Sequence, residues 1–239
     1  MRFQCTHAGE CCTNPSTQIA VTLGDIMRIK QFTKLPIEKI IPHYVAVNPF
    51  GDPEKPQTFD LELGLNIPCR FREGNRCTIY KARPLNCRLF PYWILAHAPQ
   101  EKIKEIGEPG CKCLSHFEMD EADRPVYKKY ADALGKIMEQ ESAATDNFMQ
   151  AHGFSARISL DQEEDFKKFL AKLKDKPLEE AHLALIGYCK DIIERQKYRY
   201  NELPEQISHA LKFHTFTSPE DLDKHEQILR QGLVCKLRL

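Results

Sequence analysis

The sequence of 239 residues lacks several features that would place it in a large class of proteins. No stretch approaches the ~20 apolar residues that a membrane-spanning helix needs, and the first residues, Met1 to Cys5, lack the apolar core of a secretory signal. Neither charge is in excess, since Lys plus Arg and Asp plus Glu both number 34. We therefore expect a cytoplasmic protein that does not associate with membranes or nucleic acids.

Two enzyme signatures are also missing from the sequence. No glycine-rich loop follows a predicted strand, as it does in many folds that bind nucleotide-like cofactors, and no Cys-x-x-x-Cys-x-x-Cys motif of radical enzymes occurs. The motifs therefore do not decide whether the chain is an enzyme.

Cysteine, in contrast, is abundant and unevenly distributed. Of the 10 cysteines, all but Cys189 and Cys235 precede residue 114. In a reducing compartment disulfides are rare, so clustered thiols indicate metal ligands. The candidate metal ligands are Cys5, Cys11, Cys12, Cys69, Cys77, Cys87, Cys111 and Cys113.

The spacing of these cysteines differs from that of a typical zinc finger, which takes its ligands from two tight pairs. Four thiolates suffice for one zinc ion or one iron–sulfur cluster, so this set allows two centres, or one centre with spare thiols. Successive side chains of an extended backbone point to opposite sides, so Cys11 and Cys12 favour a centre with several metal atoms, unless only one of them is a ligand. We predict an iron–sulfur cluster, with zinc as the alternative.

The segment between Cys69 and Arg88 is rich in arginine and lysine. Thiolates that share one site repel each other and need positive charges or amide donors nearby. We expect Arg83 and Arg88, which flank Cys87, to supply positive charge; the alternative is that both lie on the surface of a loop. A nucleic-acid surface is less favoured because few aromatic residues alternate with the basic ones.

The sequence predicts an α+β fold, with a small cysteine-rich N-terminal part of short strands and helices followed by an all-α C-terminal part. An acidic turn near residues 118–124 marks the expected boundary between a metal-binding domain, 1–118, and a helical domain, 119–239.

Capping signals and apolar periodicity place the individual elements. A capping box at Thr22 precedes a helix over 26–32, Pro36 opens another helix, and residues 67–80 form a hairpin that turns at 73–75. In the C-terminal part, helices are expected from Pro125, over Phe166 to Leu173, from Pro177 toward Tyr200, and from Ser218.

Together these cysteine motifs resemble a widespread bacterial family that is named after its CxxCxxCC pattern and described as zinc- or iron-chelating. The resemblance covers about the first half of the chain and implies a metal site without specifying a reaction. The motifs that carry it are Phe3-x-Cys5-x-x-Ala8-Gly9-x-Cys11-Cys12, Pro68-Cys69-x-Phe71 and Cys77-x-Ile-Tyr80-x-x-Arg83-Pro84-x-x-Cys87-Arg88-x-Phe90-Pro91.

The chain departs from the family pattern at Ala8, where the opening motif usually has a second cysteine. His7 is adjacent to this position, and imidazole can replace thiolate as a ligand of iron or zinc. Alternatively, Cys111 and Cys113 together restore the number of ligands.

Three functions are compatible with these observations. The first is a metal-binding protein with an iron–sulfur or zinc centre and no defined activity. The second is an interaction module in which zinc has a structural role and the helical half binds a protein partner. The third is a protein-modifying enzyme, because the cysteine cluster is distantly similar to that of flagellin lysine methylases.

Overall fold

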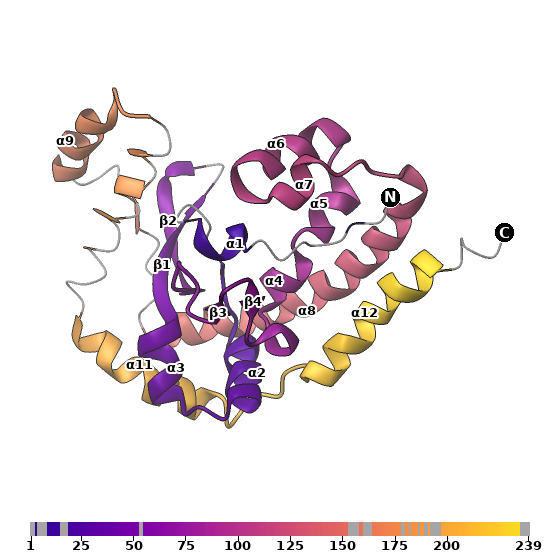
Figure 1. Ribbon diagram of the computed structural model, residues 1–239. Coiled ribbons are helices and arrows are strands. Elements are labelled where there is room, and N and C mark those ends of the chain that lie inside the picture. The colour runs from indigo at the N-terminus through magenta and orange to yellow at the C-terminus, as the bar shows by residue number, and fades with distance from the viewer. Residues whose placement is uncertain are drawn as a thin grey trace.

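The computed structural model has the α+β architecture predicted from the sequence, with a few short antiparallel strands in the N-terminal part and mostly helices after it (Figure 1). The residues that it describes are Phe3, 9–14, 19–52, 55–152, 158–159, 164–177, 180–181, 183–185, 187–188, 191 and 197–234. In this part of the chain, no helix is both long enough and apolar enough to cross a membrane.

The N-terminal part contains short elements that follow one another closely. They are α1 (Glu10–Thr13), α2 (Leu23–Thr33), α3 (Ile37–Tyr44), β1 (Val45–Asp52), β2 (Lys55–Leu65), β3 (Arg72–Glu73), β4 (Arg76–Cys77), the 3-10 helix η1 (Tyr80–Ala82), α4 (Leu85–Leu89), α5 (Tyr92–His97), α6 (Gln100–Gly110) and α7 (Lys112–Ser115).

The C-terminal part is dominated by one long helix, α8, which passes behind the N-terminal elements in Figure 1. Its elements are the 3-10 helix η2 (Glu121–Asp123), α8 (Arg124–Ala151), β5 (Ile158–Ser159), α9 (Glu164–Leu173), α11 (Lys197–Ala210) and α12 (Pro219–Val234). The helix predicted from Pro177 toward Tyr200 lies partly outside the described residues, as do Cys189 and Cys235.

Alternating apolar residues explain the main β-hairpin, of which β1 was not predicted. β1 and β2 pair antiparallel with Val45 opposite Leu65 and Val47 opposite Leu63, and β5 pairs with the other edge of β2. These four side chains and Leu61 are buried, because every second residue of a strand faces the same side of the sheet.

The predicted starts of three helices are confirmed. Thr22 and Asp25 form the capping box of α2, and Pro36 is the N-cap of α3. The Ser218 hydroxyl accepts a hydrogen bond of 3.1 Å from the Asp221 amide at the start of α12. The second hairpin is also present: β3 and β4 turn through Gly74, whose φ is 58°.

Two large hydrophobic clusters form most of the described interior, and both contain residues from either side of residue 118. The first lies against the β1–β2 hairpin, α2 and α3 and includes Phe148 of α8 and Leu203 of α11. The second lies around α5 and includes Tyr130 of α8 and Leu222 of α12. The division into domains 1–118 and 119–239 stays a prediction.

A buried ionic cluster connects α2 to α8 near the first of these hydrophobic clusters. Arg28 is fully buried and donates at 2.6 Å to Asp25 and at 2.7 Å to both carboxylate oxygens of Glu141. Thr22 donates to Glu141 at 2.7 Å. A Cβ atom on Gly24 would lie 2.2 Å from a Glu141 oxygen, so glycine is needed at this close approach.

This geometry predicts that Glu141→Ala lowers the free energy of unfolding by about 3–5 kcal/mol, because it leaves the fully buried Arg28 with only part of its compensating charge. Glu139→Ala, on an exposed position of the same helix, is the matched control and should change it by less than about 0.5 kcal/mol. Urea denaturation of the purified variants measures both values. Similar values for the two variants would contradict the structural role of the cluster.

Candidate metal centre

The first two cysteines of the candidate centre lie on the short helix α1, beside the β3–β4 hairpin. Gly9 precedes this helix with a φ of 76°, a conformation that favours glycine. The Cys12 carbonyl accepts a hydrogen bond of 2.7 Å from the Cys69 amide, which fixes α1 against the segment that leads into the hairpin.

The Sγ atoms of Cys11 and Cys12 are 3.9 Å apart. The expectation that these side chains point to opposite sides was wrong, because the backbone at this point is helical and not extended. Two thiolates bound tetrahedrally to one zinc ion at ~2.3 Å have sulfur atoms about 3.8 Å apart. Both cysteines are therefore spaced to bind one centre.

The β3–β4 hairpin places Cys69 before its first strand and Cys77 at the end of its second. The Phe71 amide donates a hydrogen bond to the sulfur of Cys69, and the Ile79 amide donates one to the sulfur of Cys77. Each sulfur thus receives the amide hydrogen of the residue two positions later. Such donors stabilise thiolates, so the hairpin suits two metal ligands.

Cys87 lies on α4, whose start is joined to the buried ionic cluster. The Leu85 amide donates a hydrogen bond of 2.9 Å to Asp25, the carboxylate that also binds Arg28. The position of Cys87 therefore depends on the same cluster that connects α2 to α8.

The last two candidate cysteines flank Lys112 at the start of α7. Cys111 is buried and Cys113 is half-buried. The Lys112 amide donates a hydrogen bond of 2.7 Å to the carboxylate of Glu10, the residue before Cys11. This bond joins two cysteine-containing segments that are 102 residues apart in the sequence.

Five of the described cysteines contact one of the two large hydrophobic clusters. The three from the central segment pack against the first cluster, whereas the two from α7 and its N-cap belong to the second. Burial and mutual repulsion of charge dominate their electrostatics. The thiolate of Cys12 influences three thiols from the other segments: Cys69, Cys77 and Cys87.

The pKa values of these thiols indicate that the site needs a positive charge before the thiols can ionise. Burial raises the pKa of Cys69 to about 11 and raises the pKa of Cys87 well above its ordinary value. Burial also raises the pKa of Cys77, although the hydrogen bond from the Ile79 amide acts in the opposite direction. The hydrogen bond between Cys11 and Cys12 raises the pKa of Cys11 and lowers that of Cys12 to about 7. A bound cation would stabilise the thiolates that burial disfavours.

Positive charge near the thiols comes from Arg72, which was not predicted, and to a smaller extent from Arg83, which was. Arg72 lies against Gly9, where a Cβ atom would be 2.4 Å from its Nε, and its charge lowers the pKa of Cys12 after the larger effect of the Cys11 hydrogen bond. Arg72 lies within the basic segment that the sequence indicated, but no motif distinguished it from its neighbours.

Arg83 and Arg88 mainly bind carboxylates of α12. Arg88 is fully buried, contacts Asp223 at 3.0 Å and Glu226 at 2.9 Å, and also donates to the Lys81 carbonyl. Arg83 contacts Glu226 at 2.7 Å, and its charge has a minor effect on nearby thiols. The expectation that Arg88 compensates the thiolates, like its alternative of a surface position, was wrong. Its carboxylate partners are more than a hundred residues away in the sequence.

The described thiols fit a cation in their chemistry, but they do not surround one point. The vicinal pair, the two amide–sulfur hydrogen bonds and the burial of the thiols suit metal ligation. In the part of the chain that the structure describes, no three Cys, His, Asp or Glu side chains are already grouped as metal ligands. Cys5, His7 and Ala8 lie outside that part.

The described thiols lie in an α+β unit with a short hairpin, an arrangement compatible with a cysteine-rich metal-binding domain. Residues 4–114, less than half of the chain, match the model of the CxxCxxCC family, described as "Putative zinc- or iron-chelating domain". The resemblance recognised in the sequence is confirmed, and zinc or iron binding is the general function that it supports.

One relative is "Uncharacterized protein MJ0661" from Methanocaldococcus jannaschii, which is 32% identical over 91 residues. The matched region is 38% of this chain and 44% of the relative, so less than half of each protein is compared. No solved structure matches the chain.

The contacts of Arg83 and Arg88 predict that Glu226→Ala lowers the free energy of unfolding by about 2–4 kcal/mol, because it removes a carboxylate from a fully buried guanidinium. Gln227→Ala, at the exposed adjacent position, should leave stability within about 0.5 kcal/mol of the wild type. Thermal and urea unfolding measure the difference. Equal stability of the two variants would show that α12 does not depend on these ion pairs.

The placement of Cys77 on the hairpin and of Cys87 on α4 predicts that Cys77→Ser or Cys87→Ser destabilises the metal-loaded protein by more than about 3 kcal/mol, because the free energy of ligand binding contributes to folding. After metal removal with a chelator, the same variants should differ from the wild type by only about 1 kcal/mol, which isolates the metal contribution. Cys189→Ser, outside the predicted ligand set, is the control and should show no such dependence on metal. Urea denaturation of the metal-loaded and the metal-free protein measures these free energies of unfolding. If each variant loses the same stability in both forms, Cys77 and Cys87 only pack the interior.

Proposed function

We propose that this chain is a cytoplasmic metal-binding protein whose centre is an iron–sulfur cluster held by thiolates of the N-terminal half. The observation that supports the proposal is that α1 is hydrogen-bonded to two other cysteine-containing segments, to the hairpin segment through Cys12 and Cys69 and to α7 through Glu10 and Lys112. The family assignment supports zinc or iron as the metal.

The number of thiols favours a cluster over a single zinc ion. Six described cysteines influence each other electrostatically, while one tetrahedral zinc ion binds four ligands. The spacing of Cys11 and Cys12 does not distinguish the two metals, since both sulfurs suit one centre. A cluster would supply one-electron transfer, whose potential depends on the hydrogen bonds to its sulfurs and on its burial.

Residues of the chain would tune such a centre in two ways. The amide hydrogens of Phe71 and Ile79 stabilise the negative charge on the sulfurs of Cys69 and Cys77. The guanidinium of Arg72 adds a positive charge beside Cys12. All three act on the α1 and hairpin side of the site, so we expect the centre to be anchored there.

Anaerobic purification followed by metal and acid-labile sulfide analysis tests the proposal. We expect iron and sulfide in comparable amounts and broad visible absorption that bleaches on reduction and decays in air. A Cys69→Ser variant should lose most of this absorption, whereas the Cys189→Ser control should retain it. Colourless protein with stoichiometric zinc that survives exposure to air would establish the alternative, a structural zinc centre. Protein that binds neither metal would refute both.

A further inference from the structure

We propose that Glu10 is a positioning residue that holds the Cys111-Lys112-Cys113 segment against the Cys11–Cys12 pair, so that these segments can share one metal centre. This inference rests on the proposed function, because it concerns how the ligands of that centre are brought together. It does not depend on whether the metal is iron or zinc.

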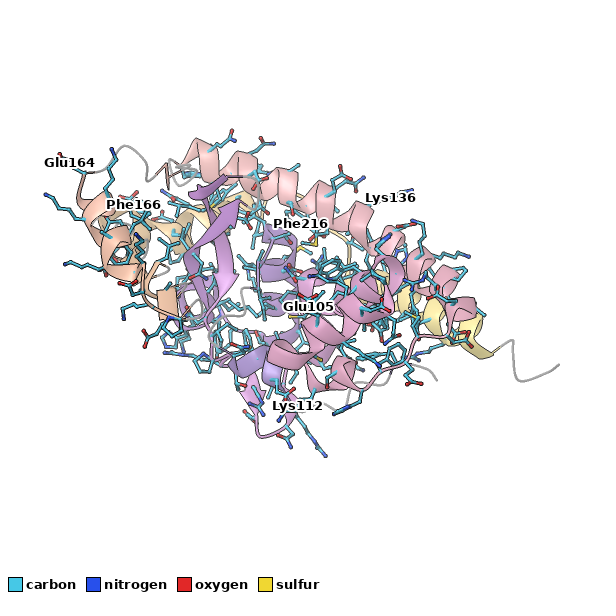
Figure 2. All side chains as sticks on the ribbon, turned by 90° about the horizontal axis from the view of Figure 1, so that it is seen from above. Glu105, Lys112, Lys136, Glu164, Phe166 and Phe216 are labelled. Atoms are coloured by element: carbon cyan, nitrogen blue, oxygen red, sulfur yellow. The ribbon has the colours of Figure 1, made fainter. Side chains whose placement is uncertain are left out.

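The carboxylate of Glu10 makes two contacts with the same residue of the other segment. One oxygen accepts a hydrogen bond of 2.7 Å from the Lys112 amide, and the other lies 3.3 Å from the Lys112 ammonium. A hydrogen bond to an ionised carboxylate is shorter and stronger than one between neutral groups. The amide contact is therefore the stronger link, since the Lys112 side chain is 78% exposed and projects at the outer edge of the molecule (Figure 2).

Both residues of this contact are direct sequence neighbours of candidate metal ligands. Glu10 immediately precedes Cys11, and Lys112 lies between Cys111 and Cys113. A bond between these two residues therefore fixes the distance between two pairs of candidate ligands.

Each partner of the contact is anchored to a different part of the protein. The carbonyl of Cys12 on α1 accepts a hydrogen bond from the amide of Cys69. On the other side, α7 packs tightly on α6: a Cβ atom on Gly107 would lie 2.4 Å from the Ser115 nitrogen, and the Cys111 amide donates to the Gly107 carbonyl at 2.9 Å. The Glu10 carboxylate thus joins the unit formed by α6 and α7 to the unit formed by α1 and the hairpin.

Four substitutions separate the amide contact from the ammonium contact. Glu10→Ala removes both contacts, while Glu10→Gln keeps a side-chain oxygen that can accept the amide hydrogen. Lys112→Pro removes the amide hydrogen and leaves Glu10 intact, at a first helical position that accepts proline. The preceding Cys111 has φ −161° and ψ 93°, outside the α region that a following proline disfavours. Lys112→Ala removes only the ammonium group.

The test is alkylation of the full chain after anaerobic reconstitution with Zn²⁺ alone, with each cysteine followed by mass spectrometry. We expect metal to protect Cys69, Cys77 and Cys111 in the wild type. In Glu10→Ala and Lys112→Pro, alkylation of Cys111 and Cys113 should accelerate about 10-fold, the lower end of effects seen when groups that orient metal ligands are lost. The hairpin cysteines should stay protected in both variants, and Glu10→Gln and Lys112→Ala should resemble the wild type.

The outcomes distinguish failure of this inference from failure of the proposed function. If Zn²⁺ protects no cysteine of the wild type and iron with sulfide is also not retained, the proposed metal centre itself fails. If the hairpin cysteines are protected but Cys111 and Cys113 react equally fast in the wild type and in Glu10→Ala, the centre stands and the role of Glu10 is refuted. Loss of protection at every cysteine in both Glu10→Ala and Lys112→Pro would also refute it, since the contact would then support the whole fold and not one segment.

Discussion

The fully buried guanidinium of Arg28 constrains the structure more than any single apolar contact, because a charge without water must be compensated by the protein. Asp25 and Glu141 provide this compensation, and the Thr217 carbonyl accepts a further hydrogen bond of 2.9 Å. These partners belong to α2, to α8 and to the segment before α12. The cluster therefore fixes helices from both halves of the chain, and through the Leu85 amide it also positions α4.

A second set of ion pairs joins the cysteine-rich part to the C-terminal helix. Arg88 directly follows Cys87 in α4, and its guanidinium is held by Asp223 and Glu226 of α12. The helices α11 and α12 also bury Leu203 and Leu222 in the two hydrophobic clusters. The cysteine-rich part and the C-terminal helices therefore share both of these clusters.

The accuracy of the sequence-based expectations depended on how local the relevant interactions are. The capping box at Thr22, the turn at Gly74 and the apolar stripe of α8 involve residues close together in the sequence, and each is present in the structure. The roles of Arg88 and Glu10 depend on partners 138 and 102 residues away, which no local pattern reveals. For the same reason, the candidate cysteines could be identified from the sequence, whereas the contacts that bring their segments together could not.

The arrangement of charges explains why a metal would complete this site. The two ionic clusters satisfy Arg28 and Arg88 with carboxylates, so neither guanidinium is left to neutralise the thiols. Burial raises the pKa of Cys69 to about 11. Among the described residues, Arg72, the Phe71 and Ile79 amides and, to a smaller extent, Arg83 oppose the cost of ionising the thiols. A cation that binds several thiolates would displace their protons and supply the missing positive charge. Metal binding and the joining of α7 to α1 are then coupled, because the cation attracts the same segments that the Glu10 carboxylate already connects.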